Sequence, residues 1–325
     1  MAPSAGEPTR LIVTVTLNAA VDKTYRIDHF QLDRVHRPAE WRIVAGGKGV
    51  NVARVYRTLG GEALASGFAG GYNGRFIERA LQHEGMPTDF ERTRQESRVC
   101  IAIVDPVNGT QTEINEAGPL VSRAEVRRLL DRVARLVARN DVDAVCLCGS
   151  SPPGAPAGMY ARMVDIARER GVRCIVDTSG PALREAIQAR PWMAKPNVHE
   201  LSDLLGWPLA TVQDIVAAAC EVAGGGVEVV AATMGRDGAI CVSPEGVWRA
   251  TTPAVPVVSA VGSGDAFVAG FLRACSLGQC MQECLRLGTA AGTANAMVYG
   301  AGFCTAAQIE EILPRVAVVP LAHEG

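Results

Sequence analysis

The apolar residues of the chain form short continuous runs, and in the segments between these runs they recur at helical spacing. Residues 11–17 are apolar and rich in β-branched side chains, which predicts a buried first strand. From residue 63 onward, similar runs alternate with longer segments whose apolar residues recur at helical spacing. This alternation predicts β-α-β units, and therefore an α/β fold with a parallel sheet covered by helices on both faces. The expected strands are 63–69, 144–148, 172–176, 193–195 and 227–233; the expected helices are 73–84, 159–170, 181–189, 281–299 and 306–313, with others starting at 122 and 211.

Two other segments alternate apolar and polar residues, a pattern typical of strands with only one covered face. They are 24–44, in which Trp41 and Ile43 alternate with polar neighbours, and the pair 99–104 and 110–115. We expect them to form a small antiparallel sheet that acts as a lid, with a face that can pair with another subunit. The predicted organisation is a disordered tail at 1–10, a core of 11–21, 46–96 and 118–325, and a lid of 22–45 and 97–117.

Composition excludes several classes of partner. The 325 residues are 48% hydrophobic and 20% charged, which is the balance of an ordinary globular protein with a sizeable core. A net charge of −2 and an aromatic content of 5% disfavour binding to nucleic acid or to an anionic membrane. The most apolar long window, 215–234, is interrupted by charged residues and glycines, and the N-terminus lacks a signal-peptide core. We therefore expect a cytoplasmic protein.

The stretch 261–272 carries the strongest candidate chemistry. Gly262 and Gly264 flank Ser263, Asp265 follows, and apolar residues then recur at helical spacing, so a helix is expected to begin near Asp265. Unpaired N–H groups at a helix start, approached closely through glycines, suit a phosphate. If that phosphate is the terminal one of a nucleotide, Asp265 can take a proton from an attacking hydroxyl. These residues alone fit equally well a helix cap that follows a glycine turn.

A second glycine-rich stretch, 45–54, also precedes a predicted helix. Its glycines would let a small polyol approach the backbone, and Asn51 would form hydrogen bonds from the first helical turn. A dinucleotide-binding fingerprint would need a core strand directly before the glycines, so a nicotinamide dehydrogenase is disfavoured. Asp22, after the first strand, is a candidate acceptor for a substrate hydroxyl. The alternatives are a plain turn at 45–54 and an exposed turn carboxylate at Asp22.

Together these motifs resemble the PfkB (ribokinase-like) carbohydrate kinases, most closely the 1-phosphofructokinase and tagatose-6-phosphate kinase branch. Residues 46–54 resemble the first family signature, and 261–265 with Gly270 resemble the second. The resemblance spans 11–313, and it implies a ribokinase-like three-layer α/β/α fold with a mainly parallel central sheet and a small β-sheet lid. Further matches are 14–22, 112–119 and 195–201; departures from the family pattern are Ala19, Met234 and Ala260.

The resemblance implies a role for each matching position. Asp265 would be the catalytic base, and the backbone of Gly262, Ser263 and Gly264 would form an anion hole for the transferred phosphoryl group. The positions matching substrate contacts are Asp22, Gly47 and Asn51 for sugar hydroxyls, Arg98 and Arg37 for the substrate phosphate (Arg37 across a dimer), and Ser150 for the sugar site. For the two arginines, the alternative is an ordinary surface position.

The resemblance also implies ATP and Mg²⁺ as cofactors. Asn197 and Glu200 match an Asn-x-x-Glu motif expected to hold Mg²⁺ through water, the alternative being a helix cap. The positions matching nucleotide contacts are Asn197, Glu200, Thr233, Gly235, Gly238, Gly264 and Asn295.

The implied activity is ATP-dependent phosphorylation of a ketohexose monophosphate, first of all fructose 1-phosphate at its 6-hydroxyl, by a homodimer paired through the lid. Tagatose 6-phosphate or fructose 6-phosphate, phosphorylated at the 1-hydroxyl, is the alternative within the branch. A kinase for an unphosphorylated sugar or nucleoside and a non-catalytic sugar-phosphate sensor are the remaining alternatives.

Overall fold

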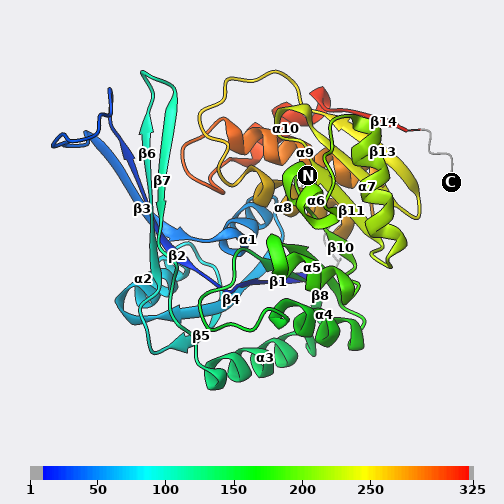
Figure 1. Cartoon of the computed structure of the whole chain (residues 1–325), viewed down its shortest axis with the longest axis horizontal. Helices are drawn as coiled ribbons and strands as arrows, with labels where there is room; N and C mark the ends of the chain where they lie inside the picture. The colour runs from blue at the N-terminus through cyan, green and yellow to red at the C-terminus, as the bar shows by residue number, and fades with distance from the viewer. Residues whose placement is uncertain (1–9, 322–325) are drawn as a thin grey trace.

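In the computed structural model, which describes residues 10–321, the strands form two sheets (Figure 1). The tail predicted at 1–10 lies outside the described residues, apart from Arg10. The large sheet has the order β14-β13-β12-β11-β10-β9-β8-β1-β4-β5. Its strands are β1 (Leu11–Thr16), β4 (Glu62–Gly70), β5 (Thr88–Thr93), β8 (Val142–Cys148), β9 (Arg173–Asp177), β10 (Met193–Ala194), β11 (Val229–Thr233), β12 (Ala239–Ser243), β13 (Gly246–Thr251) and β14 (Ala317–Pro320).

Strand pairing in the large sheet is parallel from β5 through β11 and antiparallel from β12 through β14. The predicted mainly parallel sheet is therefore confirmed, while β5 and the antiparallel β12–β14 edge were not predicted. The sequence of β5 is polar because this edge strand pairs its carboxylates with arginines of the neighbouring helix; Arg128 Nε lies 2.6 Å from Glu91 Oε1. Such a strand lacks the alternation of apolar and polar residues from which a strand can be predicted.

Helices cover both faces of the large sheet. On the central strand β1, Ile12 belongs to the cluster on one face, whereas Val13 and Val15 belong to the cluster on the other. This two-sided burial explains why the run that predicted the strand consists of apolar residues and threonines without a charged position. One face carries α1 (Lys48–Thr58), α2 (Gly71–His83), α8 (Ser263–Ser276), α9 (Met281–Ala296) and α10 (Ala306–Ile312). The other face carries α3 (Arg123–Val137), α4 (Met159–Glu169), α5 (Gly180–Gln188), α6 (Val198–Leu205) and α7 (Val212–Gly224).

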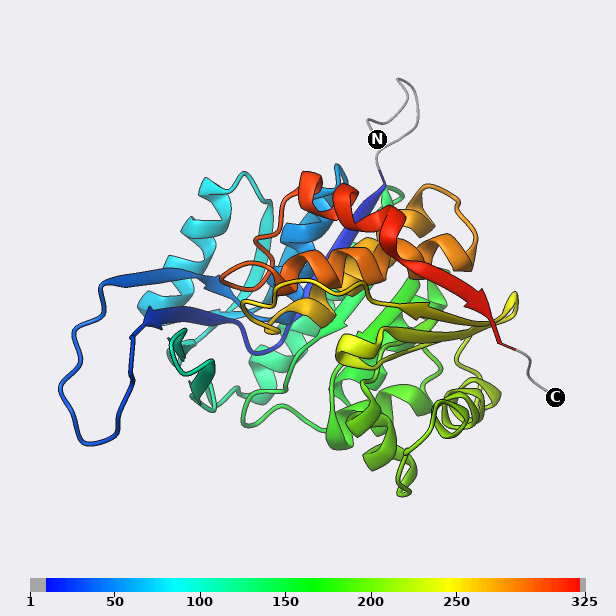
Figure 2. The same cartoon turned by 90° about the horizontal axis from the view of Figure 1, so that it is seen from above.

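The small sheet, called the lid sheet below, consists of β2 (Ala20–Arg26), β3 (Glu40–Gly46), β6 (Arg98–Asp105) and β7 (Thr110–Asn115), in the order β3-β2-β6-β7. It projects from the body of the molecule, as predicted (Figures 1 and 2). The expectation of purely antiparallel strands is wrong, because β2 and β6 pair in parallel. These two strands come from distant segments that both leave the body in the same direction. In the described part of the chain, no helix is long and apolar enough to cross a membrane.

Candidate active site

A cavity of about 1180 Å³ lies between the lid sheet and the carboxyl-terminal edge of the large sheet. This is the edge at which ligands bind in open α/β sheets. The cavity is lined by most of the residues predicted from the sequence: Asp22, Gly47, Asn51, Arg98, Asn197, Thr233, Gly235, Gly238, Gly262, Ser263, Gly264 and Asp265. Segments far apart in the chain thus meet around one space, large enough for two small-molecule substrates.

The glycine–aspartate motif lies at the start of α8. Gly262 has a φ of 80°, and a Cβ there would lie 2.4 Å from the Cβ of Ala301, so only glycine fits. Asp265 lies in the first helical turn and makes no capping hydrogen bond, which rules out its alternative assignment as the helix cap. The motif therefore presents backbone N–H groups and a carboxylate to the same cavity.

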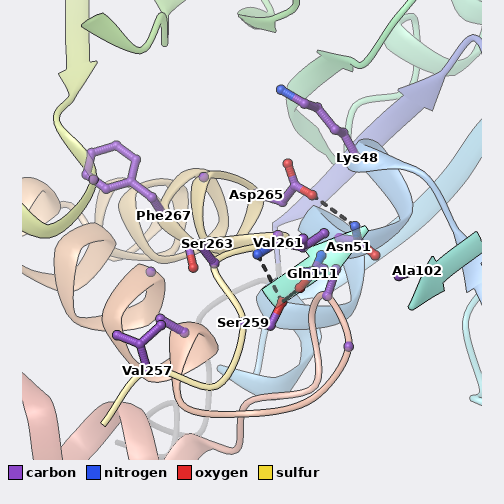
Figure 3. A pocket seen from close by; sticks show the side chains of 18 of the residues that line it. Lys48, Asn51, Ala102, Gln111, Val257, Ser259, Val261, Ser263, Asp265 and Phe267 are labelled. Carbon is purple, nitrogen blue, oxygen red and sulfur yellow. Dashed lines mark hydrogen bonds between the residues drawn. The ribbon is translucent and has the colours of Figure 1, made fainter. Parts of the chain in front are cut away.

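The carboxylate of Asp265 is buried and receives a hydrogen bond from a distant helix. Asn51 Nδ2, on α1, donates to Asp265 Oδ2 at 2.9 Å, as Figure 3 shows. Burial raises the pKa of Asp265 to about 6, in spite of the nearby Lys48 and the Asn51 hydrogen bond, which lower it. A carboxylate with a pKa in this range is ionised at neutral pH and is a stronger base than an exposed one.

Two lysines, neither assigned a role from the sequence, meet at a buried carboxylate beside this site. Asp177, at the end of β9, has no exposed side-chain surface, and its Oδ1 lies 2.9 Å from Lys48 Nζ and 3.4 Å from Lys195 Nζ. Burial would raise the pKa of Asp177, but the two ammonium groups outweigh this effect and hold it below its usual value. A Cβ on Gly264 would lie 3.3 Å from Lys195 Nζ, so this ammonium group is close to the glycine backbone.

The sequence did contain signals for these three residues. Asp177 ends a predicted strand at the ligand-binding edge, and Lys195 stands two residues before Asn197 in a matched segment. A charge placed at the end of a core strand is a recognisable mark of a site. The mutual contact of the three residues, however, depends on sheet order.

The opposite end of the cavity carries the predicted sugar contacts. A Cβ on Gly46 would lie 1.9 Å from Asp22 Oδ2, so the carboxylate packs directly on glycine backbone. Burial raises the pKa of Asp22 to about 6, although Arg98 and Arg54 lower it. Arg98 is half-buried, and its Nε donates to the backbone oxygen of Asn18 at 3.1 Å. The arginine is thus held in place beside Asp22.

Two of the predicted substrate residues do not line the cavity. Ser150 is exposed, and its Oγ accepts a hydrogen bond from Asn18 Nδ2 at 3.3 Å. Arg37 is exposed in the connection between β2 and β3. Within one chain, neither side chain faces the cavity that the other predicted residues share.

At the start of α6, beside the cavity, Asn197 and Glu200 form a reciprocal helix cap. Asn197 Oδ1 accepts from the Glu200 backbone at 2.9 Å, and Glu200 Oε2 accepts from the Asn197 backbone at 2.8 Å. The two residues therefore do form the helix cap that was the alternative to a magnesium site. Of the two, only Asn197 lines the cavity. The amide and carboxylate oxygens are still of the type that Mg²⁺ prefers.

Asn295 takes a different place from the one expected. Its side chain is fully buried, with Nδ2 donating to Val261 O at 2.9 Å and Oδ1 accepting from Gly302 N at 2.8 Å. Both ends of the amide are thus used to join the start of the glycine motif to the loop after α9. In this structure the Asn295 side chain braces the loop, in place of the direct nucleotide contact expected from the sequence.

The lid sheet reaches across the cavity to the segments around the glycine–aspartate motif. Ser259 Oγ donates to Gln111 Oε1 on β7 at 3.2 Å, and both residues appear in Figure 3. On β3, Arg42 Nη1 donates to Tyr299 O at 3.2 Å. Both edge strands of the lid sheet therefore contact segments that flank the glycine motif.

Comparison with known proteins agrees with this geometry. The family model described as pfkB family carbohydrate kinase matches residues 15–308. This chain belongs to the pfkB family of carbohydrate kinases. It is accordingly an ATP-dependent sugar kinase with the ribokinase-like fold, as the resemblance implied, and neither a dehydrogenase nor a non-catalytic sensor.

Individual pfkB kinases match over most of their length. A 1-phosphofructokinase of Rhodobacter capsulatus is 40% identical over 87% of this chain and 89% of its own. A tagatose-6-phosphate kinase of Staphylococcus epidermidis is 34% identical over 95% of this chain and 99% of its own. Phosphofructokinase-2 of Escherichia coli, solved with substrates and products, has a TM-score of 0.87 at 28% identity, covering 94% of this chain and 98% of its own.

Proposed function

We propose that this kinase phosphorylates the 6-hydroxyl of fructose 1-phosphate to give fructose 1,6-bisphosphate. The observation that carries the proposal is the shared cavity, which is lined by Asp265 and the glycine motif together with Asp22 and Arg98 and with Thr233. A sugar alcohol held by Asp22 and Arg98 and a nucleotide held at Thr233 would meet at Asp265. The similarity to the R. capsulatus 1-phosphofructokinase supports this choice of substrate.

In the proposed reaction, Asp265 accepts the proton of the 6-hydroxyl as the oxygen attacks the terminal phosphorus of ATP. The N–H groups of Gly262 to Gly264 and the nearby ammonium group of Lys195 stabilise the charge on the moving phosphoryl group. Asn197 and Glu200 would hold Mg²⁺ through water, and the ion would neutralise the nucleotide phosphates. Asp22 and Asn51 would orient the sugar, and Arg98 would bind its existing phosphate through a planar pair of donors.

The test is an ADP-release assay over a panel of fructose 1-phosphate, tagatose 6-phosphate, fructose 6-phosphate and fructose. We expect the highest kcat/KM with fructose 1-phosphate. Replacement of the base, Asp265→Asn, should lower kcat by about 10²- to 10⁴-fold while ATP binding is retained. Turnover close to that of the unmodified enzyme in this variant would contradict the proposed base.

Tagatose 6-phosphate is the second candidate, since the S. epidermidis tagatose-6-phosphate kinase matches nearly its whole length. The same site would then receive the sugar with its 1-hydroxyl toward Asp265. A higher kcat/KM for tagatose 6-phosphate in the same panel would favour this candidate.

We also propose that two copies pair through the outer face of the lid sheet. Trp41, Ile43 and Ile114 are 63%, 43% and 55% exposed, and Ile43, Ile101 and Ile114 lie in register across the sheet. Lys23 lies between Ile43 and Ile101 in this row. A mainly apolar, exposed row on a projecting sheet is the kind of surface that a second copy would cover. Pairing of this kind would bring Arg37 near the partner's cavity.

Light scattering should give a dimer that Trp41→Glu dissociates. Tyr72→Glu on α2, where the aromatic ring is 80% exposed, is the matched control and should leave the mass unchanged. A monomer in the unmodified protein would contradict pairing.

A further inference from the structure

Arg54, one turn after Asn51 on α1, is a buried arginine to which the proposed reaction gives no task. It is 7% exposed, and it uses every part of its guanidinium group. Nε and Nη2 donate to the Glu84 carboxylate at 2.8 and 3.0 Å, and Nη2 also donates to Ala45 O at 3.0 Å. The remaining nitrogen, Nη1, donates to Asn51 Oδ1 at 3.3 Å. The guanidinium is thus fixed on one side by Glu84 and faces Asn51 on the other.

The Asn51 amide stands between this arginine and the proposed base. Its Oδ1 accepts from Arg54, and its Nδ2 donates to Asp265 Oδ2 at 2.9 Å. Arginine has only donors and an ionised carboxylate has only acceptors, so a single amide orientation satisfies both neighbours. Without Arg54, the amide would be free to turn its oxygen toward Asp265, and the carboxylate would lose its hydrogen bond.

The same guanidinium braces the loop behind the glycine motif. Arg54 Nη1 also donates to Ala301 O at 3.5 Å, and its Cζ lies 4.4 Å from the centre of the Phe303 ring. Ala301 is the residue against which Gly262 packs, since a Cβ on Gly262 would lie 2.4 Å from the Ala301 Cβ. Arg54 therefore contacts the supports of both the carboxylate and the anion-binding turn.

We propose that Arg54 is a positioning residue that fixes the Asn51 amide, and through it the carboxylate of Asp265, in the orientation needed for proton transfer. The proposal rests on the assignment of Asp265 as the base. The Arg54–Glu84 ion pair is only partly buried, since the Glu84 side chain is 31% exposed, and a pair of this kind contributes little net stability. The effect of Arg54 is instead geometric. Its planar guanidinium group donates hydrogen bonds to Glu84, Ala45 and Asn51 at the same time, which fixes the orientation of the Asn51 amide.

The test compares Arg54→Lys with Arg57→Lys. Lysine keeps the charge but cannot reproduce the fork, so kcat should fall by about 10- to 100-fold, with KM for ATP changed by no more than about twofold. Arg57 is the matched control because it lies on the same helix and donates to the Glu84 backbone at 3.0 Å without contacting Asn51. Its variant should keep the kcat of the unmodified enzyme.

A double-mutant cycle separates positioning from a general structural role. If Arg54 acts through Asn51, then Arg54→Lys should slow the Asn51→Ala enzyme little or not at all, whereas independent effects would multiply. The acid limb of the kcat profile should also move to higher pH in Arg54→Lys, because the Asn51 hydrogen bond lowers the pKa of Asp265. The other charged groups that face Asp265, namely Lys48, Asp177 and Lys195, are the same in both enzymes.

The outcomes distinguish this inference from the proposed function. If Asp265→Asn retains turnover, the base assignment fails. If Asp265→Asn is inactive while Arg54→Lys keeps the kcat and pH profile of the unmodified enzyme, or if the cycle is multiplicative, the positioning role alone is overturned. If Arg54→Lys does not fold, Glu84→Gln replaces it in the same cycle. This variant leaves Arg54 in place but loosens its anchor, so a smaller fall in kcat, absent in the Asn51→Ala background, is expected.

Discussion

The ammonium nitrogen of Lys48 lies 2.9 Å from Oδ1 of Asp177, a carboxylate with no exposed side-chain surface. The two residues are joined although 129 positions separate them in the chain. Lys48 belongs to the glycine-rich turn on the proposed sugar side of the cavity, and Asp177 ends a central strand. Their contact therefore ties this turn to the middle of the sheet. The Asp177 carboxylate also holds Lys195 beside the backbone proposed to bind the transferred phosphoryl group.

The first prediction concerns Asp177. Replacement by Asn leaves two ammonium groups around a neutral buried amide, and we expect the free energy of unfolding to fall by about 3 kcal/mol or more. Asp165→Asn is the control, because its ion pair with Arg168 is exposed and should contribute less than about 1 kcal/mol. Urea unfolding measures both, and equal losses in the two variants would contradict the central role of Asp177.

The second prediction is that Asp265→Asn is more stable than the unmodified enzyme at neutral pH. Burial raises the pKa of Asp265 from 3.8 to about 6, so the folded state binds this proton more tightly than the unfolded state. The resulting stability is complete below about pH 4 and is lost as the pH rises through 6. At pH 7.5 the variant should therefore gain on the order of 1–3 kcal/mol in the free energy of unfolding. The difference should vanish near pH 4; a less stable variant at pH 7.5 would contradict this account.

The third prediction separates phosphorylated from free sugars at Arg98. Loss of charge-assisted hydrogen bonds to a substrate phosphate costs about 1.5–3 kcal/mol, so Arg98→Ala should raise KM for sugar phosphates by roughly 10- to 100-fold. Slow turnover of unphosphorylated fructose should change much less. The exposed Arg94 provides the control, and Arg94→Ala should alter neither KM. An equal effect of Arg98→Ala on both substrates would argue for an unphosphorylated substrate.

The fourth prediction compares two glycines with nearly the same backbone conformation. Gly262 and Gly278 have φ values of 80° and 71°, but a Cβ would meet Ala301 at Gly262 and would meet nothing within 4 Å at Gly278. Gly278→Ala should lose about 1 kcal/mol of stability from the left-handed backbone, and Gly262→Ala should lose more, because the clash with Ala301 adds to this cost. Only Gly262→Ala should also lower kcat, by about 100-fold or more, because it displaces the anion-binding turn. Equal kcat values in the two variants would show that the turn does not bind the phosphoryl group.

Local pattern determined most of the elements. Three features depend only on neighbouring residues, so they were predictable from the sequence: the β-branched and apolar run of β1, the capping box formed by Ser122 and Glu125, and the glycines at the start of α8. The polar strand β5 was not predicted, because the arginine that pairs with its Glu91 lies on α3, far away in the sequence. Residue types and spacing likewise singled out Asp22, Asn51 and Asp265 as candidates, and the resemblance to the pfkB family added Arg98.

Only the tertiary structure decided how these elements meet. The parallel pairing of β2 with β6, the burial of Asn295 and the contacts of Asp177 with two lysines all join segments far apart in the chain. Local sequence specifies which face of an element is buried and where the backbone can turn. It does not specify which distant group will occupy the space opposite, because that depends on the order of strands in the sheet. For this reason the role of Arg54, which depends on Glu84, Ala45 and Asn51 together, became visible only in the folded molecule.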